Sequence, residues 1–292
     1  MLETERRVNP GAEQWMNREI KCLDYGFVRL VDYMGDDGAV VQAARVSYGA
    51  GTKSVSEDRG LIRYLMRNRH TTPFEMVEFK FHCKLPIFVA RQWIRHRTAS
   101  VNEYSGRYST MKDEFYMPEL EVIARQSNAN KQGRDELLTP EQAEVVREIL
   151  KRDYATVMGD YNRLMEMGVA KELARVGLSL GAYTEWYWKI DLHNLLHFLG
   201  LRLDAHAQYE IRVFANAMAS ILKEAVPASY EAFLDYRLNA LTLSAPEIAA
   251  IARMVVPEDS AEVESLLHEQ FPKSKREVEE AMAKLRRLGL VA

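Results

Sequence analysis

The spacing of apolar and polar positions predicts an α+β chain that is mostly helical and has few strands. Alternating or aromatic-rich stretches predict strands at 21–34, 75–85 and 183–190. Helical spacing and capping signals predict helices at 39–47, 54–69, 86–93, 139–167, 169–179, 192–199, 206–225 and 228–236. Between these elements, the Arg/Ser-rich segment is expected to form loops and short turns, and 113–138 a surface excursion.

The same pattern divides the chain into three parts. Residues 1–20 are polar without clear periodicity and are expected to form an irregular arm. The composition shifts from Leu241, where capped helical patterns begin at Ser244, Ser260 and Ser274. We therefore predict a main domain at 21–240 and a helical C-terminal extension at 241–292.

Composition narrows the class of protein. The chain has 292 residues, a net charge of −3 and two cysteines, which are too few for a disulfide framework. No apolar run is long enough to span a bilayer, and the N-terminus lacks the apolar region of a signal peptide. We expect a cytoplasmic protein that does not bind a membrane. We also expect no nucleic-acid partner, since binding to nucleic acid usually requires a broad basic face.

The densest group of chemically useful side chains lies in segment 91–108. It holds four arginines, one histidine, two serines and an asparagine, with Glu103 as its only acid. Arginine donates to phosphate through a planar fork, and serine hydroxyls bind anionic oxygens. Because the positive charge is local, the segment predicts a site for a phosphorylated small molecule. Ser105 is more plausible as a phosphate ligand than as a nucleophile, because no neighbouring base would activate it.

Two histidines stand four residues apart, at 193 and 197, on one face of a predicted helix. This is a metal-ligand spacing, but the glutamate of an H-E-x-x-H motif is missing. Polar or stacking contacts to an organic ligand are favoured, and ordinary packing stays open. No metal is expected.

The run Arg95-His96-Arg97-x-x-Ser100-x-Asn102-x-x-Ser105-x-Arg107 resembles, at every fixed position, the signature of the flavin-dependent thymidylate synthases. Two further blocks resemble the same family: His70-Thr71-Thr72-Pro73-Phe74-Glu75, and the segment from Leu201 to Ile211. Together the resemblance covers roughly residues 22–238.

The resemblance implies an activity. The family converts deoxyuridine monophosphate (dUMP) to thymidine monophosphate (dTMP). Methylenetetrahydrofolate supplies the carbon, NADPH supplies electrons through a tightly bound FAD, and tetrahydrofolate is released. The implied fold is a mixed or antiparallel sheet flanked by helices. The implied assembly is a homotetramer with active sites built at subunit interfaces.

The resemblance also implies residue roles. Arg202 would be the catalytic residue, stabilising negative charge on the uracil ring. Arg175 would match an arginine donated by a neighbouring subunit. The dUMP ligands would be Gln92, Arg95, Glu103, Ser105, Gly106, Arg107, Arg175 and Arg202. The FAD ligands would be Ser47, Thr72, Glu75, Arg95, His96, Arg97, Glu103, Asp191, His193, His197 and His206.

Some positions depart from the family's pattern. Asp191 and His193 stand where some members carry Asn and Arg, which leaves the individual FAD contacts there open. Two rival functions are an RNA-modifying enzyme that uses folate and flavin, and a silent interaction protein that kept the fold. The first predicts a wide basic surface, and the second predicts losses within the signature.

Overall fold

The computed structural model describes residues 8–46, 55–128, 133–254 and 259–291, so that Ser47 lies outside the described residues. The chain forms two compact units, Met1–Leu238 and Asn239–Ala292. Each unit is described by itself.

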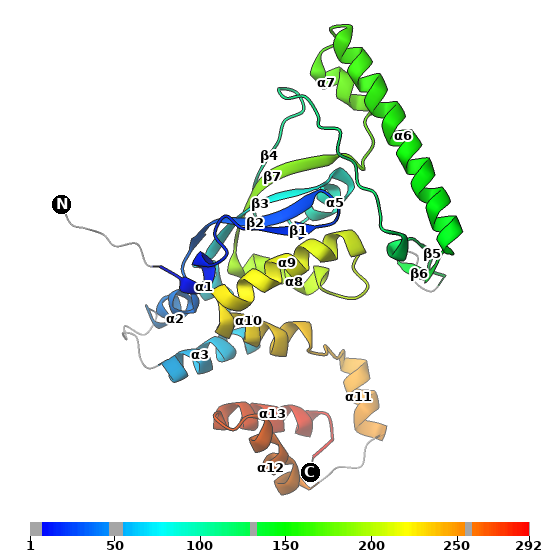
Figure 1. Ribbon diagram of the computed structural model, residues 1–292. Helices are drawn as coiled ribbons and strands as arrows, with labels where there is room; N and C mark the ends of the chain where they lie inside the picture. Colours follow the sequence, from blue (N-terminus) through cyan, green and yellow to red (C-terminus); the bar gives the residue numbers. More distant parts are fainter. Residues whose placement is uncertain (1–7, 47–54, 129–132, 255–258, 292) are drawn as a thin grey trace, which may run out of the picture. The chain divides into compact units, whose positions relative to one another are not determined.

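A five-stranded sheet organises the first unit (Figure 1). Its order is β1 (Glu19–Cys22), β2 (Gly26–Met34), β3 (Glu78–Pro86), β7 (Tyr183–Asp191) and β4 (Ser100–Glu103). Every neighbouring pair is antiparallel. The prediction of an α+β fold with an antiparallel sheet among helices is therefore confirmed.

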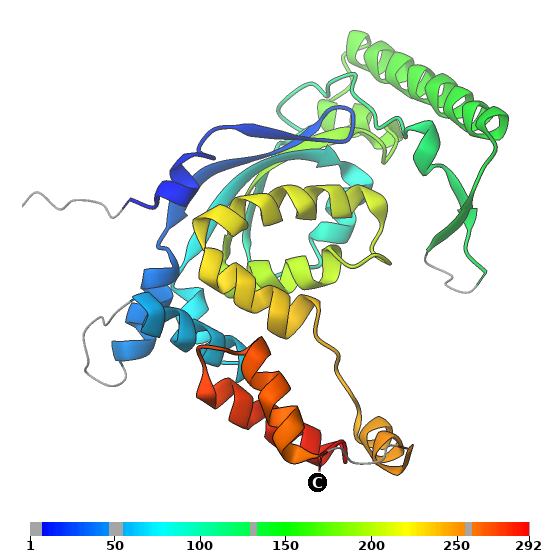
Figure 2. The same ribbon diagram turned by 60° about the horizontal axis from the view of Figure 1, so that its bottom comes forward.

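Three helices cover one face of this sheet: α5 (Ile87–Trp93), α8 (Leu192–Arg202) and α9 (Tyr209–Ala225). Figure 2 shows α8 and α9 lying across that face. The pleat explains the layer, because side chains alternate in direction along a strand. On β7, Trp186, Trp188 and Ile190 are buried against the helices, whereas Tyr187 and Lys189 are exposed on the other face.

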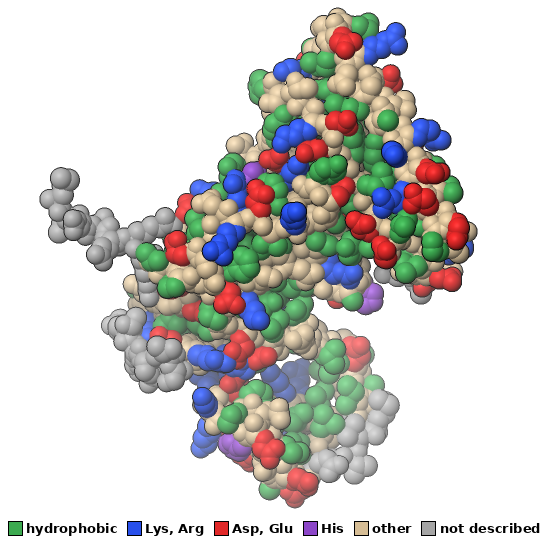
Figure 3. Space-filling model, viewed as in Figure 1, with side chains coloured by type: hydrophobic (Ala, Val, Ile, Leu, Met, Phe, Trp, Pro, Cys, Tyr) green, Lys and Arg blue, Asp and Glu red, His purple; other side chains and the backbone are tan. Residues whose placement is uncertain are grey.

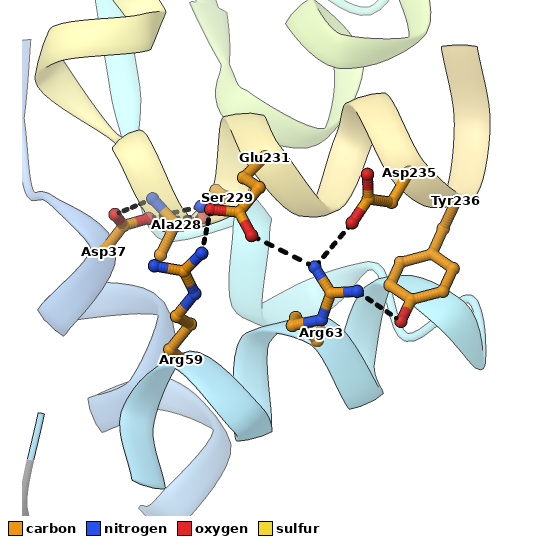
Figure 4. Close-up of polar contacts among 8 residues, drawn as sticks. All are labelled: Asp37, Arg59, Arg63, Ala228, Ser229, Glu231, Asp235 and Tyr236. Atoms are coloured by element: carbon orange, nitrogen blue, oxygen red, sulfur yellow. Dashed lines mark hydrogen bonds and ion pairs between the residues drawn. The ribbon is translucent and has the colours of Figure 1, made fainter. Parts of the chain in front are cut away.

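A second helical group lies beside the sheet. It comprises α2 (Asp37–Val46), α3 (Val55–Arg67), α4 (Thr72–Glu75) and α10 (Pro227–Phe233), and α10 continues into a π-helical turn, η3 (Leu234–Leu238). Helix α3 packs along α10. Polar contacts from Arg59 and Arg63 of α3 join it to Glu231 of α10 and to Asp235 and Tyr236 of η3 (Figure 4).

Beyond the β4–β7 edge, the long helix α6 (Pro140–Glu166) packs with α7 (Lys171–Ala174) and the short turn η2 (Arg175–Gly177). They share a small core that includes Met111, Phe115 and Tyr161. Before α6, the chain forms the turn η1 (Leu120–Val122) and a hairpin of β5 (Ala124–Gln126) and β6 (Arg134–Leu137).

Two local capping signals identified the start of a helix correctly. Thr139 caps α6 through a capping box with Gln142, and Asp191 caps α8 by accepting from the Asn194 amide. Both caps were predicted.

Other predictions were wrong. Residues 9–20 are not an irregular arm: they contain α1 (Pro10–Glu13) and enter β1, and Ala12 is fully buried. Segment 21–34 is a hairpin of two strands, because the chain turns between Cys22 and Gly26. The Arg/Ser-rich segment contains a strand, β4, since its backbone can pair with the edge of β7 despite a polar sequence.

The second unit contains α11 (Ala245–Met254), α12 (Ser260–Gln270) and α13 (Lys275–Arg287). Helices α12 and α13 bury Val278, Met282 and Val291 in a core of their own. Ser274 caps α13 as predicted, but Asp259 rather than Ser260 caps α12. No helix in the described parts of the chain is long and apolar enough to cross a membrane.

Candidate active site

The signature segment starts from a rigid point, the end of α5. Trp93, the last residue of α5, is fully buried and stacks on Phe198 of α8 at 4.8 Å between ring centroids. It also meets Trp188 of β7 edge-on at 5.1 Å. Such aromatic packing fixes the direction in which the loop 94–99 leaves the core. β4 then returns the chain to the sheet, with Asn102 opposite Tyr187.

Three side chains of the signature loop and α8 form what we call the arginine–histidine cluster: His96, His197 and Arg202. The Arg202 Nε donates to His96 Nε2 at 3.1 Å, and the His96 and His197 rings lie 6.1 Å apart. Arg202 ends α8, where the helix dipole favours a cation. The resemblance assigned Arg202 to dUMP and the two histidines to FAD, and the structure brings the three side chains together.

Burial sets the charge within this cluster. Burial, together with the neighbouring charges of Arg202 and His197, lowers the pKa of His96 to about 4. Burial also lowers the pKa of Arg202. A guanidinium nevertheless keeps its proton in proteins. The pair therefore consists of a neutral imidazole that accepts and a cation that donates.

Two arginines of the signature are exposed and, among the described residues, unpaired. Arg95 and Arg97 are exposed, and within the described residues neither makes a hydrogen bond or an ion pair. Gln92, one turn earlier on α5, has a buried Oε1 that lacks a partner among those residues. Since buried polar atoms are normally hydrogen-bonded, Gln92 and the two arginines have donor or acceptor capacity to spare for a ligand.

A second group, which we call the glycine–arginine cluster, consists of Ser105, Gly106, Arg107 and Arg175. A Cβ placed on Gly106 would lie 3.2 Å from Arg175 Cδ and 3.4 Å from its Nη1. The Arg107 amide donates to Ser105 Oγ at 3.3 Å. The Arg107 side chain pairs with Glu172 of α7 at 3.2 Å, an exposed pair that a ligand can displace at little cost.

Glu103 lies at the end of β4, between His96 and Ser105 in the sequence. Its Oε1 accepts from Thr184 Oγ1 of β7 at 2.7 Å. Thr184 is buried, so this bond holds one carboxylate oxygen in place while the exposed side of Glu103 remains accessible. Among the described residues, no hydrogen bond or ion pair joins the arginine–histidine cluster to the glycine–arginine cluster.

A pocket of about 260 Å³ opens beside the arginine–histidine cluster and contains His197 in its wall. It lies between α8, the α3–α4 region and the end of α10. Its lining is Met66, His70, Thr71, Phe74, His193, Leu196, His197, Gly200, Leu201, Phe233 and Arg237. None of these residues is acidic. Of the residues predicted to bind FAD, His193 and His197 line this pocket, and Thr72 and Glu75 belong to α4, whose Phe74 lines it.

Two predicted FAD residues are engaged elsewhere. Both carboxylate oxygens of Asp191 bind Asn194, at 2.9 Å to its amide and 2.7 Å to its side chain. His206 follows α8 in an exposed turn, where its Nδ1 lies 2.9 Å from Asp204 Oδ1. In the described parts of the chain, no group of three or more His, Cys, Asp or Glu is arranged to hold a metal ion.

Sequence reasoning missed part of the pocket. His70 was noticed only as part of a motif, and Met66, Phe233 and Arg237 were not singled out. An apolar helix face gives no local sign that it lines a cavity. Arg237 was hidden because nothing in the sequence indicates the π-helical turn that carries it.

Comparison with known proteins decides the family. The sequence profile described as "Thymidylate synthase complementing protein" matches residues 29–228. A flavin-dependent thymidylate synthase of Gluconobacter oxydans (strain 621H) is 59% identical over 258 residues, 87% of this chain and 85% of that protein. Another, of Rickettsia conorii, is 54% identical over 296 residues, 97% and 99% of the two chains.

The chain belongs to the flavin-dependent thymidylate synthase family.

A solved structure supports the same fold. The UMP/dUMP methylase PolB from Streptomyces cacaoi, bound with 5-Br dUMP, is similar with a TM-score of 0.68 and 33% identity. The match covers 75% of this chain and 99% of that one. As in the family, this flavin-dependent thymidylate synthase uses FAD as cofactor and folate and NADPH as co-substrates.

Proposed function

We propose that this flavin-dependent thymidylate synthase methylates dUMP to dTMP with the two clusters and the pocket described above. Methylenetetrahydrofolate donates the carbon, NADPH is oxidised through FAD, and tetrahydrofolate leaves. The observation that carries the proposal is the contact between Arg202 and His96, because it joins a signature residue to the catalytic candidate from α8.

The glycine–arginine cluster suits the 5′-phosphate of dUMP. Arg107 and Arg175 supply cations, Ser105 supplies a hydroxyl, and Gly106 lets a ligand approach the backbone closely. Gln92, Arg95 and Glu103 are proposed to bind the sugar and base, since the first has an unpaired buried oxygen and the last is oriented by Thr184. These assignments complete the dUMP site together with Arg202.

Arg202 is proposed as the catalytic residue. The C5 carbon of uracil becomes nucleophilic as negative charge develops on the ring nitrogen and oxygens, and a fixed guanidinium stabilises that charge. His96 accepts from Arg202 Nε, which leaves the two terminal nitrogens of the guanidinium for the substrate. Its neutral state avoids a second cation that would repel the first.

The pocket suits FAD. Its walls combine apolar surface with three histidines and an arginine and contain no carboxylate, a composition that accepts a flat, anionic molecule. We propose that Thr72, Glu75, His193 and His197 hold the cofactor from this side, and Arg95, His96, Arg97 and Glu103 from the signature. Asp191, His206 and Ser47 remain proposed contacts. When bound, FAD carries electrons from NADPH to the transferred carbon.

We also propose a homotetramer whose active sites are shared. Gly106 and Arg175 lie side by side in one chain, so an Arg175 donated to a neighbouring subunit would bring the whole glycine–arginine cluster with it. The arginine–histidine cluster would come from the other subunit. Residues 21–240 would carry the chemistry, and 241–292 would be an extension. A cytoplasmic location suits the free thiols of Cys22 and Cys83.

The RNA-modifying alternative is less well supported. Figure 3 displays one face of the molecule, on which Lys and Arg alternate with Asp and Glu and do not form a broad basic area. The net charge of −3 fits this picture.

Anaerobic turnover tests the function. Purified protein given dUMP, methylenetetrahydrofolate and NADPH should form dTMP and tetrahydrofolate in equal amounts, and the protein should be yellow. Dihydrofolate as the product, or a protein that takes up no flavin on titration, would contradict the proposal.

Arg202→Ala separates the two half-reactions. We expect dTMP formation to be abolished while NADPH oxidation by the bound flavin is largely retained, because only the uracil chemistry requires this cation. Arg202→Lys should recover part of the dTMP activity. Equal loss of both half-reactions in Arg202→Ala would indicate a structural role.

A further inference from the structure

The π-helical turn η3, at the end of α10, changes which way the last side chains of that helix point. Turns of this kind are rare and recur at functional sites. Here the turn carries Tyr236 and Arg237 in succession. Tyr236 contacts α3, whereas Arg237 lines the pocket proposed for FAD.

A network of polar contacts fixes α10 and η3 at both ends, as Figure 4 shows. At the start, Asp37 of α2 accepts from the backbone amides of Ala228 at 2.7 Å and Ser229 at 2.9 Å. At the end, Arg63 of α3 donates to Asp235 at 2.6 Å and to the hydroxyl of Tyr236 at 2.9 Å.

This network leaves Arg237 out. Its two predecessors in the turn are held against α3, so the backbone position of Arg237 is set by contacts that do not consume its own guanidinium. Within the described residues, Arg237 makes no hydrogen bond or ion pair. A cation held in a pocket wall by its neighbours, with its own donors unused, is pre-organised to bind an anion.

The surroundings of Arg237 specify the chemistry of that anion. The apolar residues Met66, Phe74 and Phe233 would contact a flat ring system, and His70, His193 and His197 would add hydrogen-bond donors. Burial, and the nearby charge of Arg69, lower the pKa of Arg237. A bound phosphate would offset both the burial of the Arg237 guanidinium and its repulsion from Arg69, since arginine and phosphate form charge-assisted bidentate pairs.

We propose that Arg237 binds a phosphate group of a dinucleotide cofactor in this pocket. The inference rests on the proposed placement of the cofactor there. Two sources carry the required group: the diphosphate of FAD and the 2′-phosphate of NADPH. Arg237 would thus be a binding residue that lies outside the signature and outside the two further blocks that resemble the family.

Arg237→Gln tests the proposal with the full-length protein. The variant keeps a polar side chain but loses the charge. Apoprotein is titrated with FAD, and the quenching of flavin fluorescence gives the dissociation constant. If the FAD diphosphate is the ligand, this constant should rise about tenfold or more, as expected for the loss of a charge-assisted hydrogen bond. Arg237→Lys should restore part of the affinity.

The second arm uses the FAD-loaded protein and follows flavin reduction by NADPH and by NADH. If the 2′-phosphate is the ligand, the KM for NADPH should rise about tenfold in Arg237→Gln, and the KM for NADH, which lacks that group, should not change. Arg69→Gln is the matched control, because it removes a nearby exposed cation that does not line the pocket. Because the charge of Arg69 acts on Arg237, Arg69→Gln should change both the dissociation constant and the KM far less than Arg237→Gln does.

The outcomes are distinct. Unchanged FAD affinity together with an unchanged NADPH KM overturns the role of Arg237, as does an effect confined to the KM for methylenetetrahydrofolate. An equal effect of Arg69→Gln would indicate general electrostatics and would also overturn it. If the wild-type apoprotein fails to bind FAD at all, the proposed function fails instead. Should Arg237→Gln not fold, Arg237→Ala replaces it in both arms, with the same expected and contradicting results.

Discussion

At the scale of single residues, the charge state of His96 is the most informative quantity. Its ring accepts from Arg202 and is partly buried, and both factors disfavour protonation. The neutral form is required if the guanidinium is to keep its present orientation. The state of this ring therefore reports whether the arginine–histidine cluster is formed.

We expect the His96 ring to titrate with a midpoint at about 4 in NMR spectra of the ligand-free protein. In Arg202→Ala the midpoint should rise only partway toward 6.5, because burial is the larger cause. As the pH falls from about 6.5 to about 4, His96 becomes protonated in the unfolded protein but stays neutral in the folded protein. The free energy of unfolding should fall over that range. Titration of His96 near 6.5 in the wild-type protein would contradict the cluster.

Gly106 is the residue whose substitution should separate binding from stability. An alanine Cβ there would lie 2.8 Å from Met111 Sδ and would press on Arg175. We expect Gly106→Ala to lower dUMP affinity about tenfold or more, with a loss of about 1 kcal/mol in stability. Calorimetric dUMP titration and urea denaturation measure the two effects.

Gly159→Ala is the matched control. Gly159 lies within α6, and a Cβ there would meet nothing within 4 Å. The substitution should stabilise the protein by about 0.5–1 kcal/mol and leave dUMP affinity unchanged. If both alanines act alike on dUMP binding, the close approach at Gly106 has no functional meaning.

Residue types could be predicted from the sequence better than their partners. The cap formed by Asp191 and the importance of Gly106 follow from local chemistry. The pairing of Arg107 with Glu172 does not, because the two residues are 65 positions apart and meet only through tertiary packing. The same holds for the Thr184 bond that orients Glu103.

At the scale of elements, success followed the strength of the local pattern. Helix α6 has a clear N-cap and strand β7 has an aromatic-rich sequence, and both were predicted within a residue or two. Strand β4 was missed because its pairing with β7, rather than its polar sequence, makes it a strand. The predicted helix at 169–179 contracts to α7 and a 3-10 turn.

The β5–β6 hairpin is held to α9 by a buried charge. Arg134 of β6 contacts Glu210, whose side chain is 1% exposed and also accepts from the Tyr116 hydroxyl at 3.0 Å. We expect Arg134→Met to destabilise the protein by about 1–3 kcal/mol, because it leaves a buried carboxylate without its cation. Urea denaturation measures the change.

Arg125→Met on the neighbouring strand is the control. Arg125 faces Glu136 at 3.9 Å, and both side chains are well exposed. Its removal should change stability by less than about 0.5 kcal/mol. Equal effects of the two substitutions would show that the buried carboxylate does not depend on Arg134.

At the scale of the whole molecule, one chain provides two clusters that no hydrogen bond or ion pair joins among the described residues. The sequence could indicate that both belong to one function, through the signature and the second family block. It could not indicate which residues share a cluster, because Gly106 and Arg175 are far apart in sequence and adjacent only in the fold. If each active site takes one cluster from each of two subunits, a subunit with one cluster disabled can be complemented by a subunit in which the other cluster is disabled.

Mixing two inactive variants tests this account most directly. Arg175→Ala disables the glycine–arginine cluster, and Arg202→Ala disables the arginine–histidine cluster. Co-assembled in equal amounts, they should form dTMP at about a quarter of the wild-type rate, because a quarter of the shared sites then receive two intact clusters. Arg107→Ala mixed with Arg175→Ala should stay inactive, since both lie in the same cluster. A mixture of Arg175→Ala and Arg202→Ala that remains as inactive as either variant alone would contradict sites shared between subunits.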